Sequence, residues 1–294
     1  EMRPSLCYLA RADGRLHEQK AELVVVACNG VGTPRLLLNS TSNLFPDGLA
    51  NRSGLVGRNL MFHPLTGVAG VFEEPMLGHE GPMACSILSQ EFYETDPQRD
   101  FVRGYGLHSG RSTTPMTFAL GGYGVDSPIP WGAEHREIMD TVYPYLAGLT
   151  VVTEDLPEET NRVTLDPDLT DSDGIPAPSI TYRLGENTRK MLCHGQERAA
   201  ELLLAAGARK IIAKGSDDVW WRAGWHQMGT CRMGDDPEKS VVNGWGRCHD
   251  VRNLFIVDGS IFVTSGAVNP TSTIQALALY VGDRIKTNIA NLFD

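Results

Sequence analysis

Two short, unbroken apolar segments lie near opposite ends of this 294-residue chain, and each is followed by residues that favour a turn. Residues 23–27 read LVVVA and precede Asn29 and Gly30, while residues 253–257 read NLFIV and precede Asp258 and Gly259. Such runs are typical of strands buried on both faces of a parallel sheet. We therefore predict that the two ends of the chain join one sheet-containing α/β domain.

A helix is expected after each of these strands. Thr33 is a cap-type residue and Pro34 suits a first helical position, so the first helix is predicted to start there. The last helix is predicted to begin at Pro270 with Asn269 as its cap. Its apolar positions recur at helical spacing, namely Ile274, Leu277, Ala278, Val281 and Ile285. Before the first strand, alternation over residues 5–10 and a turn at Asp13 and Gly14 predict a hairpin.

The middle of the chain has a different pattern of apolar and turn-forming residues. From Leu60 to Asp218, short apolar pieces alternate with Gly and Pro, as in antiparallel strands with long loops. One helix is predicted within it, over residues 186–206, with Gly207 as its carboxy-terminal cap. The predicted division is 1–59 in the α/β domain, 60–218 as an inserted antiparallel-sheet domain, and 219–294 in the α/β domain again. The predicted fold class is thus α/β plus α+β.

Composition excludes several functions. With 26 Lys and Arg against 36 Asp and Glu, the net charge of −10 argues against a partner nucleic acid. The first ten residues lack the pattern of a signal peptide and no run of about 18 apolar residues occurs, so we expect a soluble chain or the soluble portion of one. The six cysteines form no CxxC pair, and no zinc site or disulfide framework is predicted. The sequence leaves the localisation unknown.

Two segments carry residues suited to catalysis. Residues 225–234 read WHQMGTCRMG, with His226 among glycines and small polar residues. A lone histidine is more often structural than catalytic, although its pKa lies in a useful range. Residues 265–273 read SGAVNPTST and precede the last helix. The free amides at that helix start, with the positive end of the helix dipole, favour negative charge on a ligand.

Five segments together resemble the glucose-methanol-choline (GMC) oxidoreductase family, in its carboxy-terminal portion. They are HQMGTCRMG at 226–234, VNPTSTIQALAL at 268–279, NLFIVDGSIF at 253–262, NGVGTPRLLLNS at 29–40 and GLVGRNLMFHP at 54–64. The DDP and SVV that follow the histidine segment are similar to the choline- and gluconate-dehydrogenase-like branch. The resemblance runs from about Val24 to Ile285.

The resemblance implies a flavoenzyme that transfers hydride from an alcohol carbon to N5 of FAD. His226 matches the family's catalytic histidine, and Asn269 matches a position held by Asn or a second His that orients the substrate oxygen. The cofactor-binding positions implied are Asn29, Gly30, Thr33, Asp258, Gly259, Pro270 and Thr271. The substrate class implied is a sugar, polyol or sugar acid. The electron acceptor, whether oxygen, a quinone or a cytochrome subunit, stays open.

The sequence departs from this family in one large respect. No GxGxxG follows a strand near the amino terminus, so the expected phosphate-binding turn is missing. We therefore expect the carboxy-terminal portion of a longer or split enzyme, which needs an amino-terminal half to hold FAD. The alternative is a non-catalytic fragment that folds and has no turnover. A nicotinamide dehydrogenase is disfavoured by the same missing glycine motif.

Other candidate residues are assigned structural roles. Asp166, Asp168, Asp171 and Asp173 precede Gly174 in a calcium-loop-like run, but the remaining ligand positions do not fit, so a turn between strands is predicted and no metal site. His63 is expected to be a turn histidine satisfied by backbone. His194 and His249 lack metal-ligand spacing, and Trp220, Trp221 and Trp225 are assigned equally to a substrate cavity or to core packing.

Overall fold

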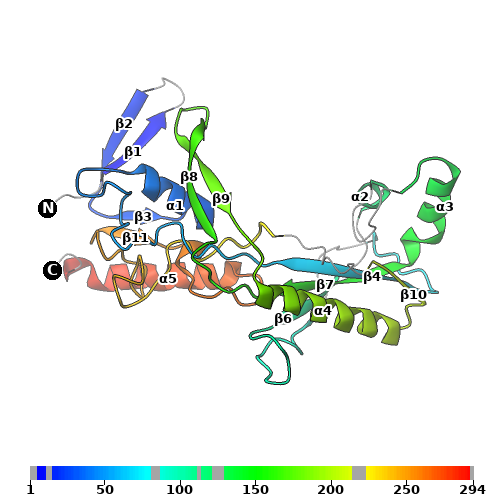
Figure 1. The fold of residues 1–294 in the computed structure, drawn as a ribbon. Helices are drawn as coiled ribbons and strands as arrows, with labels where there is room; N and C mark the ends of the chain where they lie inside the picture. Colours follow the sequence, from blue (N-terminus) through cyan, green and yellow to red (C-terminus); the bar gives the residue numbers. More distant parts are fainter. Residues whose placement is uncertain are drawn as a thin grey trace.

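The computed structural model describes residues 5–10, 15–80, 87–110, 114–120, 129–213 and 223–291. The two ends of the chain meet in a parallel strand pair, in which β3 (Val24–Val26) lies beside β11 (Leu254–Ile256). Figure 1 shows both termini at this end of the molecule, with α1 (Asn29–Asn39) and α5 (Thr271–Asn288) beside the pair. The predicted parallel pairing is therefore present. The predicted turn at Asp13 and Gly14 lies outside the described residues.

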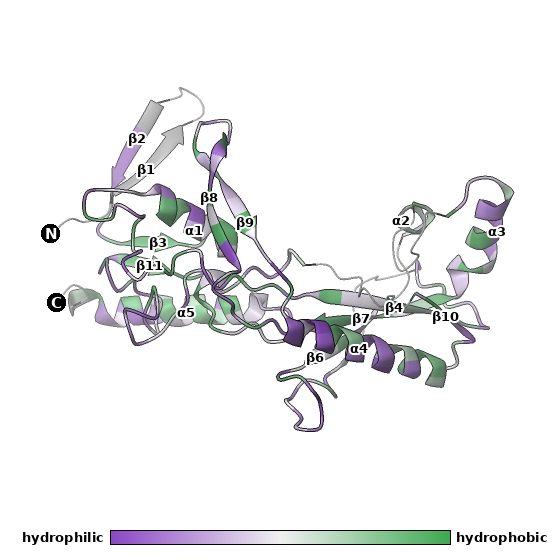
Figure 2. Cartoon of the chain, viewed as in Figure 1, coloured by the Kyte–Doolittle hydropathy of each residue, from purple (hydrophilic) through white to green (hydrophobic). Residues whose placement is uncertain are grey.

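One hydrophobic core joins these elements. It includes Val26 of β3, Leu37 of α1, Leu254 and Ile256 of β11, and Ile261 of the short helix η2 (Gly259–Ile261). Figure 2 shows β3 and β11 in the colour of hydrophobic residues. Even so, Val25 is 48% exposed, so β3 is not buried on both faces within the described residues. The short helix η3 (Ile289–Asn291) follows α5.

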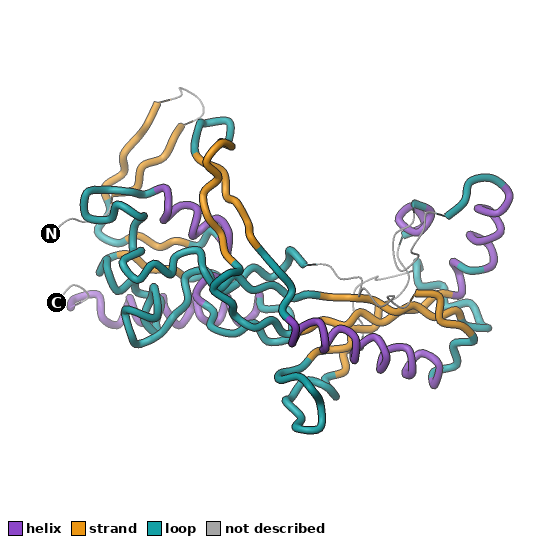
Figure 3. Tube along the Cα trace, viewed as in Figure 1, coloured by secondary structure: helices purple, strands orange, loops and turns teal. Residues whose placement is uncertain are grey.

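The middle of the chain forms a five-stranded antiparallel sheet in the order β10-β4-β7-β6-β5. The strands are β4 (Leu65–Val71), β5 (Leu88–Ser89), β6 (Tyr105–Gly110), β7 (Leu146–Thr153) and β10 (Lys210–Ala213). Helix α4 (Glu186–Ala205) runs along the sheet in Figure 3 and packs a second core on it, with Met191 and Leu203 against Val68 and Val151. The smaller helices are α2 (Pro115–Ala119), α3 (Ala133–Thr141) and η1 (Tyr143–Tyr145).

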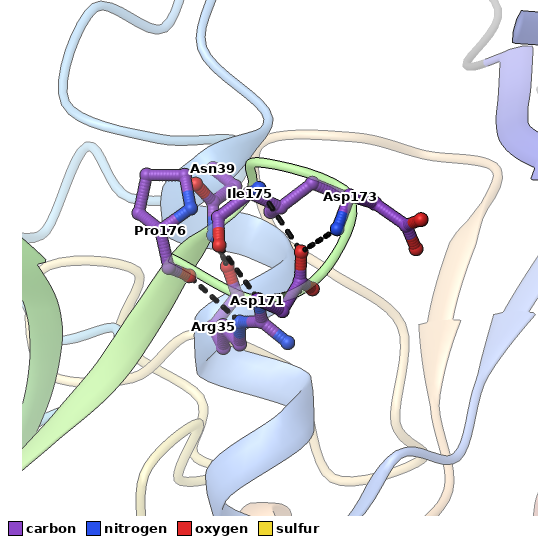
Figure 4. A network of polar contacts seen from close by, with 6 residues as sticks. All are labelled: Arg35, Asn39, Asp171, Asp173, Ile175 and Pro176. Carbon is purple, nitrogen blue, oxygen red and sulfur yellow. Dashed lines mark hydrogen bonds and ion pairs between the residues drawn. The ribbon is translucent and has the colours of Figure 1, made fainter. Parts of the chain in front are cut away.

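Two hairpins complete the fold, β1 (Ser5–Ala10) with β2 (Arg15–Lys20) and β8 (Arg162–Thr170) with β9 (Pro176–Thr181). The turn of the second hairpin is fixed to α1. Asp171 Oδ1 accepts the amides of Asp173 and Ile175, and its Oδ2 pairs with Arg35 at 2.8 Å. Figure 4 shows Arg35 also donating to the carbonyl of Pro176. The turn predicted instead of a calcium loop is confirmed.

The helix boundaries agree with the sequence prediction at α4 and differ at α1. Helix α4 ends close to Gly207, which has φ +99° as expected of a carboxy-terminal cap. Helix α1 begins at Asn29, so the predicted cap at Thr33 and start at Pro34 are wrong. Asn29 has φ +68° and its Oδ1 accepts the amides of Val31 and Gly32, which is how a capping side chain acts. No helix in the described segments is long and apolar enough to span a membrane.

Candidate active site

His226 lies in a loop that is held on several sides by backbone hydrogen bonds. Met228 exchanges two of them with Met61, and the amides of Gly229 and Cys231 donate to the carbonyls of Gly259 and Ser260. His226 itself has φ +58°, an uncommon conformation for a residue with a side chain. The loop therefore fixes the direction of the imidazole at a cost in backbone strain.

A proline in α1 contributes to this anchoring. Pro34 lies inside the helix and has no amide hydrogen, so the carbonyl of Gly30, four residues earlier, has no partner within the helix. The Thr230 hydroxyl donates to that carbonyl at 2.8 Å in a buried position. Gly30 also has no room for a Cβ, which would lie 2.6 Å from the backbone of Gln227. The histidine loop and α1 are thus in direct contact.

The structure brings the two predicted catalytic residues together. Asn269 Nδ2 lies 3.4 Å from His226 Nε2, although 43 residues separate them in sequence. The predicted cap role of Asn269 is wrong, because α5 begins at Thr271 and no side chain in the described residues caps it. The Asn269 amide instead points to the imidazole, and it is exposed while His226 is half-buried.

His63 is the main site residue that sequence reasoning assigned otherwise. Its Nε2 lies 3.2 Å from the carbonyl oxygen of Ser265, as expected of a histidine satisfied by backbone. Its Nδ1, however, lies 2.6 Å from Nδ1 of His226, and the two rings meet edge to face. His63 is only 1% exposed, so this pair is the inner part of the site. The signal in the sequence was its place in the segment GLVGRNLMFHP.

A buried carboxylate, Asp155, supports the His63 side of the site. It accepts hydrogen bonds from the Phe62 amide, from Tyr182 Oη at 2.8 Å and from Thr188 Oγ1. The backbone amide of Asp155 donates to Ser265 Oγ at 2.7 Å. Burial raises the pKa of the Asp155 carboxyl to about 6, against the effect of these hydrogen bonds. The residues before His63 and around Ser265 are therefore held at one point.

The electrostatics keep both histidines neutral near pH 7. Burial, followed by the charge of His226, lowers the pKa of His63 to about 4. Burial is also the main cause that lowers the pKa of His226, with His108 of β6 as the second cause. A neutral imidazole has a free nitrogen lone pair and can accept a proton. His226 is thus in the form that a general base requires.

The predicted cofactor residues of the α/β part cluster around Asp258. Its carboxylate accepts Thr33 Oγ1 at 2.5 Å, the Asn29 amide at 3.1 Å and the Ser260 amide at 2.8 Å. Thr33 and Asp258 are buried, and a Cβ on Gly259 would lie 2.7 Å from the Gln227 carbonyl. These side chains therefore hold α1, β11 and the histidine loop together. Of this group, only Asn29 is exposed.

The start of α5 is open to a ligand. Thr271, Ser272 and Thr273 are exposed, and their amides precede the first intrahelical bond, which Ile274 makes to Pro270. Pro270 itself is buried. Uncapped amides at the positive end of an 18-residue helix attract an electron-rich group. The residues present thus fit the anionic edge of a flavin ring next to the His226 and Asn269 pair.

The remaining candidate residues lie elsewhere or have structural partners. His194 Nδ1 lies 2.7 Å from the Tyr105 hydroxyl oxygen, and His249 lies 2.9 Å from Ser240 Oγ. Trp225 is half exposed, whereas Trp220 and Trp221 lie outside the described residues. Within the described ranges, no group of three or more His, Cys, Asp or Glu residues is placed to hold a metal ion.

Comparison with known proteins identifies a family match over part of the chain. Residues 157–278, which include His226 and Asn269, match the family described as GMC oxidoreductase. This region belongs to the GMC oxidoreductase family. The relatives of this chain include 2-methyl-1,2-propanediol dehydrogenase of Mycolicibacterium austroafricanum, 43% identical over 98% of this chain and 52% of the relative. Fructose dehydrogenase large subunit of Gluconobacter japonicus is 32% identical over 94% of this chain and 49% of the relative.

The fold is similar to that of a solved structure. Pyridoxine 4-oxidase from Mesorbium loti superimposes with a TM-score of 0.66 and 19% identity, over 98% of this chain and 55% of that chain. The chain thus spans about half the length of the relatives it matches. The names of these relatives denote dehydrogenases and oxidases, in agreement with the oxidoreductase expected from the sequence.

Proposed function

We propose that this chain supplies the catalytic residues of an FAD-dependent alcohol oxidoreductase. The observation that carries the proposal is the contact between His226 and Asn269, 3.4 Å apart beside the uncapped start of α5. When bound, FAD would accept the hydride that leaves the alcohol carbon at its N5. The hydroxyl proton goes to the protein, and an aldehyde or ketone remains.

His226 acts as the general base in this proposal. Its Nε2 is the nitrogen that faces Asn269, and its lowered pKa keeps the ring neutral near pH 7. An alcohol oxygen within about 3 Å of Nε2 could transfer its proton as the C–H bond breaks. The lone pair of the resulting alkoxide drives the hydride from the carbon.

Asn269 orients the substrate. Its amide group is exposed next to His226, and it can donate to the alcohol oxygen and accept from a neighbouring hydroxyl. Holding the oxygen beside the base converts the proton transfer into a step within one complex. Because the pair comes from two separate segments, substrate would bind where these segments meet.

The start of α5 and the ends of β3 and β11 would hold the cofactor. The amides of Thr271 to Thr273 would face the electron-rich edge of the flavin, where negative charge develops on reduction. Asn29 is exposed at the carboxyl end of β3, where ligands of parallel sheets bind. The buried side chains of Thr33, Asp258 and Pro270 would act by holding that backbone in place.

The antiparallel sheet is proposed to cover the substrate, with 60–218 as an inserted substrate domain between two pieces of an FAD-binding domain, 1–59 and 219–294. The relatives' names include a diol dehydrogenase and a fructose dehydrogenase, so we propose a polyol or a sugar as substrate and keep a sugar acid as the further member of the expected class. The fructose enzyme is named as a large subunit, and a separate electron-acceptor subunit is part of the proposal.

The test measures flavin reduction by alcohols. The 294 residues are produced together with a polypeptide that corresponds to the half of the relatives that they do not match. FAD is then added. Anaerobic bleaching of the flavin absorbance by a polyol or sugar, lost in His226→Ala, is expected. If no alcohol bleaches the flavin although FAD is bound, the non-catalytic alternative stands and the proposal is wrong.

A further inference from the structure

The contact between His63 and His226 joins two imidazoles through the same type of nitrogen, Nδ1, at 2.6 Å. A hydrogen bond of this kind needs one ring to donate and the other to accept. The other nitrogen of each ring decides the question. His63 Nε2 faces the Ser265 carbonyl, while His226 Nε2 faces the Asn269 amide.

The Ser265 carbonyl can only accept a hydrogen bond, so the hydrogen of neutral His63 lies on Nε2. Nδ1 of His63 then carries a lone pair and accepts. The Nδ1 of His226 must therefore carry the hydrogen and donate to it. As a result, Nε2 of His226 has the lone pair, and the Asn269 Nδ2 group can donate to it.

We infer that His63 is a positioning residue that holds His226 in the Nδ1–H tautomer, with the basic lone pair on Nε2 toward the substrate. The inference rests on the proposed function, in which His226 Nε2 is the base. The direction of every hydrogen in the series follows from the contact between His63 Nε2 and the Ser265 carbonyl. Nothing in the substrate is needed to select this tautomer.

Neighbouring groups hold the hydrogen-bonded series of Ser265, His63, His226 and Asn269 in place. His63 and Ser265 are both buried, and Asp155 bonds to the Phe62 amide on one side and to Ser265 Oγ on the other. Burial lowers the pKa of His63 to about 4, so this ring stays neutral and keeps its accepting lone pair. His108 of β6 acts electrostatically on both rings and lowers the pKa of each.

The arrangement also affects basicity. When His226 takes up a proton at Nε2, its Nδ1–H becomes the donor of a charged ring, and such hydrogen bonds are shorter and stronger than neutral ones. His63 therefore stabilises protonated His226 more than neutral His226. Loss of this acceptor should lower the pKa of His226 and weaken it as a base.

Two matched variants separate the acceptor from the volume of the ring. His63→Asn retains an acceptor oxygen near the position of Nδ1, whereas His63→Leu fills similar space without one. In the FAD-loaded enzyme, His63→Leu is expected to lower kcat about tenfold or more with little change in KM, and to move the acidic limb of the pH profile to lower pH. His63→Asn should stay within about threefold of the unchanged enzyme.

A spectroscopic measurement gives the tautomer directly. With ¹⁵N-labelled histidine, long-range proton–nitrogen NMR spectra assigned through His226→Ala should show the Nδ1–H form of His226 in the wild type and in His63→Asn. His63→Leu should lose that form. A wild-type His226 with its hydrogen on Nε2, or a His63→Leu variant with unchanged tautomer, kcat and pH profile, would overturn the inference.

The two proposals fail in different ways. An Nδ1–H His226 without alcohol oxidation in the FAD-loaded protein would leave the positioning role and remove the proposed function. Alcohol oxidation by a wild-type protein whose His226 carries its hydrogen on Nε2 would leave the proposed function and remove the positioning role of His63. The tautomer of the wild type and of His63→Asn answers the question even where His63→Leu does not fold.

Discussion

A histidine in a left-handed conformation, placed against a second histidine and an asparagine, is costly to hold. The φ of +58° at His226 is maintained by the hydrogen bonds that fix residues 228–231 to Met61, Gly259 and Ser260. Strain of this type is typical of functional positions, where a side chain must point in a direction the chain does not favour. The side chain of His226 is thus where we expect substitutions to change activity most.

His226→Ala is expected to lower kcat by about 10²-fold or more, because loss of a positioned base has an effect of this size. Steady-state oxidation of a polyol by the FAD-loaded protein measures it. His135→Ala is the matched control, since His135 is a partly exposed histidine on α3 that contacts Trp131 and the carbonyl oxygen of Pro130. Equal kcat in His226→Ala and the wild type would contradict the role of His226.

Asn269→Ala is expected to lower kcat about tenfold, the effect of losing one hydrogen bond of 1.4 kcal/mol that forms in the reacting complex. Asn269 is exposed, so its replacement should leave the thermal midpoint unchanged. Kinetics and thermal unfolding of the same preparation test both statements. A fall in thermal midpoint that accounts for the lost activity would show a structural role instead.

Asp155 is expected to give stability a distinctive pH dependence. Its folded pKa of about 6 lies above the ordinary value of 3.8, so the folded protein binds the proton more tightly than the unfolded chain does. Between about pH 4 and 6 the free energy of unfolding should therefore fall as pH rises. Asp155→Asn removes this contribution and leaves that of His63, which has the opposite sign. Urea unfolding of the wild type and of Asp155→Asn from pH 4 to 7 gives the difference between their free energies of unfolding, which measures this contribution. A difference that does not vary with pH would contradict the prediction.

At the scale of elements, Pro34 lies inside α1, whereas the sequence predicted it at the start of the helix. A Thr followed by Pro predicts a helix start, and the prediction was wrong because Asn29 caps the helix one turn earlier. Asn29 has φ +68°, and its amide donates to Asp258, a residue 229 positions away. Local propensity cannot include such a contact. Where ends are set locally, as at Gly207 after α4, the prediction was right.

The link between α1 and the histidine loop can be measured by a double-mutant cycle. Thr230→Val removes the hydroxyl that bonds to the Gly30 carbonyl, leaving a buried acceptor unsatisfied at a cost of about 1–3 kcal/mol. Pro34→Ala supplies an amide hydrogen to the same carbonyl. Thr230→Val should therefore destabilise the Pro34→Ala protein less than the wild type, as judged by urea unfolding. Strictly additive effects would contradict the shared carbonyl.

At the scale of the whole molecule, the candidate site is an assembly of distant segments. His63, His226 and Asn269 come from three parts of the chain, and the strands that bring these parts together pair across 230 residues. The sequence allowed the two apolar strands, the last helix and the pair of His226 and Asn269 to be predicted. The contact between His63 and His226 was not predicted, because a contact between residues 163 positions apart leaves no periodic pattern in the sequence. The electrostatic effect of His108 on these two histidines was not predicted for the same reason.

The 294 residues alone are expected to bind FAD weakly, because their sequence contains no GxGxxG turn to hold the pyrophosphate. Fluorescence titration with FAD tests this against the same chain co-produced with the segment that matches the other half of its relatives. Tight, stoichiometric yellow cofactor on the 294 residues alone would contradict the expectation. No FAD binding in the pair would contradict the proposed cofactor.

The bond from Thr230 to Gly30 has a consequence for how the protein is made. Its two residues lie 200 positions apart, and a ribosome adding about 5–20 residues per second needs roughly 10–40 s between them. Throughout that interval the Gly30 carbonyl lacks the Thr230 hydroxyl, and β3 lacks the partner strand β11 that it has in the structure. The candidate site can therefore close only after Thr230 has been synthesised, so the rate of translation between these two positions, or a chaperone bound during that interval, should affect the yield of folded protein.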